Sequence, residues 1–193
     1  MRALIPILLL AALATGGCDR QSATGSQAEE SLSGVNAAAA SLGDKLDRTH
    51  KGEPAPALSF TDAAGRKRTV ADFAGKPVLL NLWATWCAPC VKEMPTLDAL
   101  AMAKGESLHV LTVSQDIDSP DTKATEKVAS FFAEAKYRTL RPYLDSDLGW
   151  SMTLGVNLPT TFLFDSAGRE VWRLSGDLDW TSPTAAALLG EAG

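Results

Sequence analysis

The segment WATWCAPC, residues 83–90, contains two cysteines, Cys87 and Cys90, separated only by alanine and proline. Three kinds of site use two thiols at this spacing. The pair could be half of a zinc site, a structural disulfide, or a redox dithiol that alternates between thiols and a disulfide. The rest of the sequence has to discriminate between these alternatives.

The zinc site and the structural disulfide are the less favoured alternatives. A closed zinc site needs four ligands, and the only histidines in the sequence, His50 and His109, lie far from the cysteines and from each other. A disulfide between Cys87 and Cys90 would close a very short loop, so it would remove little entropy from the unfolded chain.

A redox dithiol agrees with the elements on either side of the pair. Residues 77–84, PVLLNLWA, are nearly all apolar, which is typical of a strand buried on both faces. A helix is predicted over about 89–103. Cys87 would then lie at the helix start, where free N–H groups and the helix dipole favour a thiolate. Cys90, almost one turn further on, is expected to be the more covered, resolving thiol.

The chain around the motif predicts an α/β domain. Strand and helix patterns follow one another, and parallel strands joined by helices place an active site at the carboxyl ends of the strands. The further predicted elements are a hairpin at 57–70, a helical turn at 70–75, a strand at 107–114, helices at 125–136 and 145–156, a hairpin at 160–176 and a helix at 182–192.

The first residues are read as an export signal rather than as part of the fold. Arg2 gives a positive start, the apolar run that follows is too short to span a bilayer, and small residues precede Cys18. This ending resembles a bacterial lipoprotein signal, which predicts a signal peptide at 1–17 and lipidation of Cys18. Residues 18–50 are read as a flexible tether, and 51–193 as the domain.

Composition narrows the class of partner. The chain has 193 residues and a formal net charge of -5, without a basic cluster. These features argue against nucleic-acid binding. With Cys18 lipidated, Cys87 and Cys90 are the remaining thiols in an oxidising compartment.

Several motifs together resemble the thioredoxin superfamily, and within it the TlpA branch of membrane-anchored thiol–disulfide proteins, related to ResA and CcmG. They are NLWATWCAPC (81–90), the KEMP that follows it, LPTTFLFD (158–165) and SGDLDW (175–180). The resemblance covers about residues 52–190. It implies a thioredoxin-like fold, with a central mixed β-sheet, helices on both faces and an added N-terminal β-hairpin.

The resemblance also implies roles for individual residues. Cys87 matches the family's nucleophile and Cys90 the resolving cysteine, with a redox disulfide between them. Pro159 matches the cis-proline beside that disulfide, and the backbone of Leu158 matches the position that pairs with a partner peptide. Trp86 is expected at the rim of the partner site.

Glu93 is a further candidate for catalysis. It matches a glutamate of the ResA and TlpA branch. The alternative, an ordinary solvent-exposed residue of the helix, agrees equally well with the sequence. Thioredoxin has a buried aspartate in the strand before the motif as proton acceptor for the resolving thiol, and this chain has Asn81 there. An amide cannot take the proton. Glu93, one turn beyond Cys90, is the nearest carboxylate in sequence that could.

The expected function is reduction of disulfides in partner proteins, without a cofactor or metal. The resemblance implies apocytochrome c or copper-assembly proteins as partners and a membrane thiol electron donor. We expect a monomer, lipid-anchored on the periplasmic side of the inner membrane of a Gram-negative bacterium, since Asp19 resembles the inner-membrane retention residue. A disulfide-forming oxidant and a copper-binding assembly factor are the alternatives.

Overall fold

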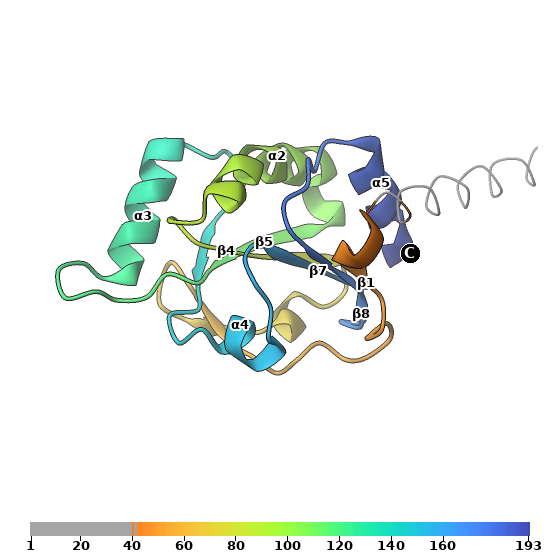
Figure 1. Ribbon diagram of the computed structural model, residues 1–193, viewed down its shortest axis with the longest axis horizontal. Helices are drawn as coiled ribbons and strands as arrows, with labels where there is room; N and C mark the ends of the chain where they lie inside the picture. The colour runs from red at the N-terminus through yellow and green to blue at the C-terminus, as the bar shows by residue number, and fades with distance from the viewer. Residues whose placement is uncertain (1–39, 41) are drawn as a thin grey trace, which may run out of the picture.

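One mixed sheet organises the part of the chain that the computed structural model describes, residues 40 and 42–193 (Figure 1). The strand order is β1-β8-β7-β4-β5-β6-β2-β3. The strands are β1 (Leu46–Asp47), β2 (Phe60–Asp62), β3 (Lys67–Arg68), β4 (Val78–Trp83), β5 (His109–Ser114), β6 (Pro142–Leu144), β7 (Thr160–Phe164) and β8 (Glu170–Ser175).

Helices cover both faces of this sheet, as in the thioredoxin-like fold that the sequence predicts. Figure 1 shows α2, α3 and α5 on one side and α4 on the other. The helices are α2 (Ala88–Lys104), α3 (Ala124–Ala135), α4 (Gly149–Leu154) and α5 (Pro183–Leu189), and the shorter 3-10 turns are η1 (Gly43–Lys45), η2 (Val70–Phe73), η3 (Gly105–Ser107) and η4 (Gly190–Ala192).

Strand β4 lies at the centre and is buried along its whole length. It pairs in parallel with β5 and antiparallel with β7. Alternate side chains enter two different cores because successive residues of a strand point to opposite faces. Leu79 and Trp83 pack in the core with α2 and α5, whereas Leu80 and Leu82 pack with Trp150 of α4. The predicted two-sided burial of this strand is confirmed.

The predicted N-terminal hairpin is present and extends the sheet. Strands β2 and β3 pair antiparallel, and β2 also pairs with β6. The sequence did not predict β6, because Pro142–Leu144 is only three residues long and begins with proline. Strand β6 thus links the hairpin to β5 and the centre of the sheet.

The helix predicted over 145–156 is shorter than expected. It begins at Gly149, because the buried carboxylate of Asp145 accepts hydrogen bonds from the backbone N–H groups of Gly149 (3.1 Å) and Trp150 (2.8 Å). Residues 145–148 therefore form the turn that satisfies the free donors at the helix start.

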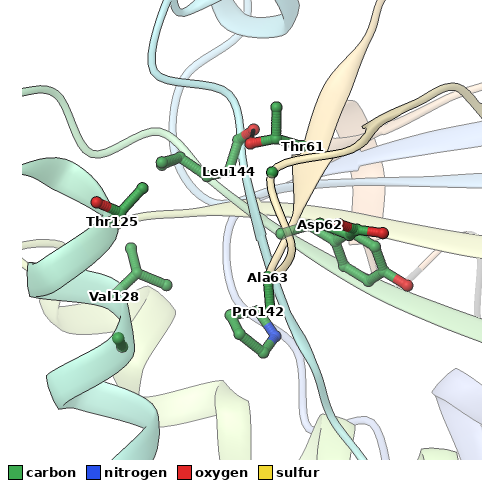
Figure 2. A pocket seen from close by; sticks show the side chains of 10 residues that line it. Thr61, Asp62, Ala63, Thr125, Val128, Pro142 and Leu144 are labelled. Carbon is green, nitrogen blue, oxygen red and sulfur yellow. Dashed lines mark hydrogen bonds between the residues drawn. The ribbon is translucent and has the colours of Figure 1, made fainter.

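A pocket of about 140 Å³ lies where the hairpin meets α3 (Figure 2). Thr125 and Val128 of α3 lie on one side of it, and Ala63 and Pro142 on the other. Its lining comes from β2, the β2–β3 turn, α3 and β6, so it belongs to this junction and not to the CxxC segment between β4 and α2.

The ordered domain begins before residue 51, within the range that we assigned to the tether. Strand β1 pairs antiparallel with β8 and forms one edge of the sheet. The guanidinium of Arg48 donates two hydrogen bonds to the carboxylate of Glu191 near the C-terminus. Residues 1–39, which include the rest of the tether and the predicted signal, lie outside the described residues. Within the described part, no helix is both long enough and apolar enough to cross a membrane.

The Arg48–Glu191 pair should contribute measurably to stability. Its two-pronged geometry and partial burial place it at the upper end of the range for surface ion pairs. We expect Arg48→Ala to lower the free energy of unfolding by about 1 kcal/mol in urea titrations. Lys51→Ala, which removes an exposed cation of the same segment, is the control. Equal stability of the two variants would contradict this contribution.

Candidate functional site

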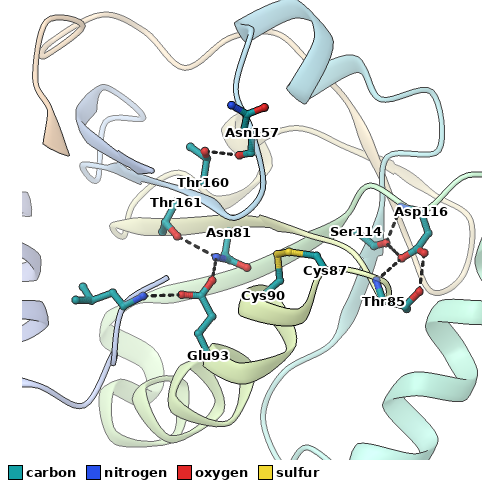
Figure 3. The surroundings of a disulfide bond; sticks show 11 residues. Asn81, Thr85, Cys87, Cys90, Glu93, Ser114, Asp116, Asn157, Thr160 and Thr161 are labelled. Atoms are coloured by element: carbon teal, nitrogen blue, oxygen red, sulfur yellow. Dashed lines mark hydrogen bonds between the residues drawn. A yellow bond between two sulfur atoms is a disulfide. The ribbon is translucent and has the colours of Figure 1, made fainter. Parts of the chain in front are cut away.

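The two motif cysteines form a disulfide at the junction of β4 and α2 (Figure 3). Cys87 is the N-cap residue of α2 and Cys90 lies in its first turn, with their Cα atoms 5.3 Å apart. Cys90 has no exposed surface and Cys87 keeps 6%. The order of exposure is the expected one, but in this oxidised form Cys87 is itself largely covered.

A buried carboxylate anchors the loop that leads into the motif. Asp116, just beyond β5, accepts hydrogen bonds from the backbone N–H (2.9 Å) and the hydroxyl (2.7 Å) of Thr85. The hydroxyl of Ser114 donates to the same carboxylate at 2.7 Å. Figure 3 shows this cluster on the Cys87 side of the disulfide. Asp116 therefore ties the turn before Cys87 to the neighbouring strand, a role that sequence reasoning missed.

The segment before β7 supplies the proline that the resemblance implied. The Leu158–Pro159 peptide bond is cis. Pro159 is buried, and its carbonyl accepts a hydrogen bond of 2.8 Å from the backbone N–H of Gly176. Leu158 is half-buried.

An open groove of about 560 Å³ begins next to the motif and runs toward α4. Trp86, with 69% of its surface exposed, and Leu158 both line it, as do Ile117 and Leu148. The structure thus brings two of the predicted partner-binding residues to one surface beside Cys87. Large apolar side chains that remain exposed next to a reactive group are suited to contact with another polypeptide.

Glu93 is not a solvated residue. It lies on α2 and only 2% of its surface is exposed. Its carboxylate accepts hydrogen bonds from Asn81 Nδ2 (2.8 Å), the backbone N–H of Leu178 (3.1 Å) and Trp180 Nε1 (3.0 Å). Burial raises the pKa of Glu93, and Asp177 acts in the same direction, whereas the three hydrogen bonds oppose the rise.

Asn81 connects this carboxylate to the sheet. It is fully buried in β4, and its second amide hydrogen bond, of 2.9 Å, goes to the hydroxyl of Thr161 in β7. Thr161, Leu178 and Trp180 were not predicted as site residues. Trp180 belongs to the SGDLDW motif, which carried the family resemblance without indicating a role.

The predicted lipidation of Cys18 stays a prediction, because Cys18 lies outside the described residues. Among residues 42–193, no three His, Cys, Asp or Glu side chains gather as a metal site would require.

The burial of Glu93 predicts a pH-dependent stability. Its pKa in the folded state is raised above the ordinary value of 4.5, so the folded state binds the proton more tightly than the unfolded state. The stability that Glu93 contributes is therefore fully present below about pH 4.5 and declines as the pH rises through the folded pKa. We expect the stability of the wild type relative to Glu93→Gln to fall over this interval in urea titrations.

The exposed Glu134 offers a matched control, since Glu134→Gln removes a carboxylate that solvent surrounds. The difference in the free energy of unfolding between Glu134→Gln and the wild type should change little with pH. If the free energies of unfolding of the wild type and Glu93→Gln differ by a constant amount from about pH 4 to pH 8, the perturbed ionisation of Glu93 is contradicted.

Comparisons with known proteins agree with this geometry. The model of the redoxin family matches residues 50–189. The thiol-disulfide oxidoreductase ResA of Bacillus thuringiensis subsp. konkukian is 34% identical over 134 residues, which cover 69% of this chain and 74% of the relative. The thioredoxin-like protein YneN of Bacillus subtilis is 34% identical over 119 residues, covering 61% of this chain and 67% of YneN.

Solved structures share the fold. A putative thiol-disulfide oxidoreductase from Bacteroides vulgatus has a TM-score of 0.62 at 27% identity, covering 74% of this chain and 96% of that one. A putative thiol:disulfide interchange protein DsbE from Chlorobium tepidum has a TM-score of 0.62 at 23% identity, covering 74% of this chain and 98% of that one. With the CxxC disulfide at the start of α2, these matches lead to one conclusion. The chain belongs to the redoxin family and is a ResA-like thiol–disulfide oxidoreductase of the thioredoxin superfamily.

Proposed function

We propose that this oxidoreductase reduces disulfides in partner proteins on the periplasmic side of the inner membrane, to which Cys18 tethers it through a lipid. The observation that carries the proposal is the open groove that exposed Trp86, the residue before Cys87, lines together with Leu158 of the cis-proline segment. A polypeptide that contacts this apolar surface brings its own disulfide within reach of Cys87.

The exchange follows from the different surroundings of the two sulfurs. In the reduced protein the Cys87 thiolate, favoured by the N-terminus of α2, attacks one sulfur of the partner disulfide and releases the other as a thiolate. Cys90 loses its proton and attacks Cys87 in the mixed disulfide. The partner leaves as a dithiol, and the Cys87–Cys90 disulfide forms again, ready for reduction by a membrane thiol donor.

The buried carboxylate supports reduction rather than oxidation as the direction of exchange. A negative charge on Glu93 opposes a second negative charge on a nearby sulfur. It therefore destabilises the ionised dithiol relative to the disulfide, which is the property of a reductant. The helix N-terminus acts in the opposite direction at Cys87, so the measured potential decides between a reductant and the alternative, a disulfide-forming oxidant.

The partner class is proposed from the family and the compartment. An apocytochrome c must keep the two cysteines of its C-x-x-C-H haem-attachment motif reduced, and copper-assembly proteins have the same requirement for their thiol ligands. Both are protein disulfide substrates that an extended groove beside Cys87 can accept. The signal predicted at 1–17 and the predicted lipidation of Cys18 support export and anchoring, and the monomer remains our expectation.

A trapping experiment tests this function. A peptide that contains an oxidised C-x-x-C-H segment serves as probe, and Cys90→Ser should accumulate a mixed disulfide between Cys87 and the peptide, because no resolving thiol is present. Cys87→Ser is the matched control and should trap none. The wild type, supplied with a dithiol, should reduce the peptide, and its potential should lie nearer about -270 mV than about -120 mV. A potential near the second value would identify an oxidant.

Glu93 is proposed as the base that takes the proton of Cys90, directly or through one water. The substitution Glu93→Gln keeps the shape and removes the base, so it should slow resolution of the mixed disulfide by about 10²–10⁴-fold and alter its pH dependence. Lys92→Gln changes the neighbouring, exposed residue and should leave the rate near that of the wild type. Resolution by Glu93→Gln at the wild-type rate at every pH would remove Glu93 from the mechanism.

A further inference from the structure

Asn81 has a buried oxygen that the oxidised protein leaves without a hydrogen-bond partner. The side chain is fully buried, and its Oδ1 accepts no hydrogen bond. Such an acceptor normally finds a donor, because a buried polar atom without one destabilises the state that contains it. The orphaned oxygen therefore points to a donor that appears in another state of the protein.

The hydrogen bonds of Nδ2 determine the orientation of the Asn81 amide. Asn81 Nδ2 donates to Glu93 Oε1 and to Thr161 Oγ1, and a flipped amide would place its oxygen against the carboxylate oxygen. Both amide hydrogens are used in this arrangement. The direction of Oδ1 is thus determined by two hydrogen bonds to two different elements.

The oxygen points toward the turn of α2 that contains Cys90. Cys90 and Glu93 are three residues apart on one helix, so they lie on the same face, one turn apart. Figure 3 shows the Asn81 oxygen on the side of the disulfide, with Glu93 on the side of the nitrogen.

We propose that Asn81 Oδ1 accepts a hydrogen bond from the thiol of Cys90 when the disulfide is reduced, and that Asn81 is a positioning residue for the resolving cysteine. A disulfide sulfur carries no hydrogen, so the oxygen is orphaned only in the oxidised state. Reduction by a dithiol breaks the bond between the two sulfurs, while the donor's thiols form a disulfide. One of the two protons they lose stays on Cys90 and the other goes to Cys87 or, when Cys87 ionises, to solvent.

Two consequences follow for the exchange. The hydrogen bond exists only in the dithiol state, so it stabilises that state relative to the disulfide and raises the reduction potential. It also turns the Cys90 proton toward the side of the helix where Glu93 lies. The inference rests on thiol–disulfide exchange itself and not on the partner class proposed above.

Redox equilibrium with glutathione tests the first consequence without any protein partner. Asn81→Leu removes the acceptor at similar size, and we expect the equilibrium constant for reduction to fall about five- to tenfold, a potential about 20–30 mV more negative. Thr161→Val removes a partner of Nδ2 but leaves Oδ1 in place, so its constant should stay within about twofold of the wild type. An unchanged constant in Asn81→Leu, or an equal shift in Thr161→Val, would overturn the proposal.

The S–H stretching band tests the hydrogen bond directly and does not require Asn81→Leu to fold. The full chain with Cys18→Ser and Cys87→Ser has Cys90 as its only thiol, since the sequence contains three cysteines. We expect its infrared S–H band at the lower frequency of a hydrogen-bonded thiol. A band at the frequency of a free thiol would overturn the proposal even if partner reduction proceeds as proposed. If partner reduction fails while the band is shifted, the proposed function is wrong and this inference stands.

Discussion

The buried carboxylate of Glu93 is the interaction on which the site depends. It accepts hydrogen bonds from three parts of the chain: Asn81 in β4, the backbone at Leu178 and the indole of Trp180. A carboxyl group this deep in a protein is tolerated only when it is hydrogen-bonded. The same contacts join α2, the central strand and the β8–α5 connection, so the helix that carries Cys90 is held against the sheet by the group proposed to deprotonate it.

A second buried carboxylate performs the corresponding role on the other side of the disulfide. Asp116 fixes Thr85, and Thr85 lies two residues before Cys87. Each end of the CxxC segment is therefore tied to the sheet by a carboxylate that is almost fully buried. Rigid support of this kind is what disulfide exchange requires, because the two sulfurs must return to bonding distance after each reaction.

Sequence reasoning predicted the elements with strong local signals and missed those without one. The apolar run of β4, the hairpin of β2 and β3 and the start of α5 at Ser182 and Pro183 all follow from residue type and spacing. The short strands β1 and β6 have only two and three residues, and each exists because a longer strand is available for pairing, β8 for β1 and β5 for β6. That availability is a property of the folded sheet, so no local pattern indicates it.

The amino-acid sequence by itself determined the chemistry of this protein: two thiols at CxxC spacing, after an apolar strand and at the start of a helix, together with motifs that identify the family. Only the tertiary structure decided the environment of each group. Glu93 could be read equally as an exposed helix residue, because an α-helix presents one residue in three or four to each direction and the sequence does not say what faces it. Packing of α2 against Asn81 and Trp180 made it buried, and burial is what changes its proton affinity.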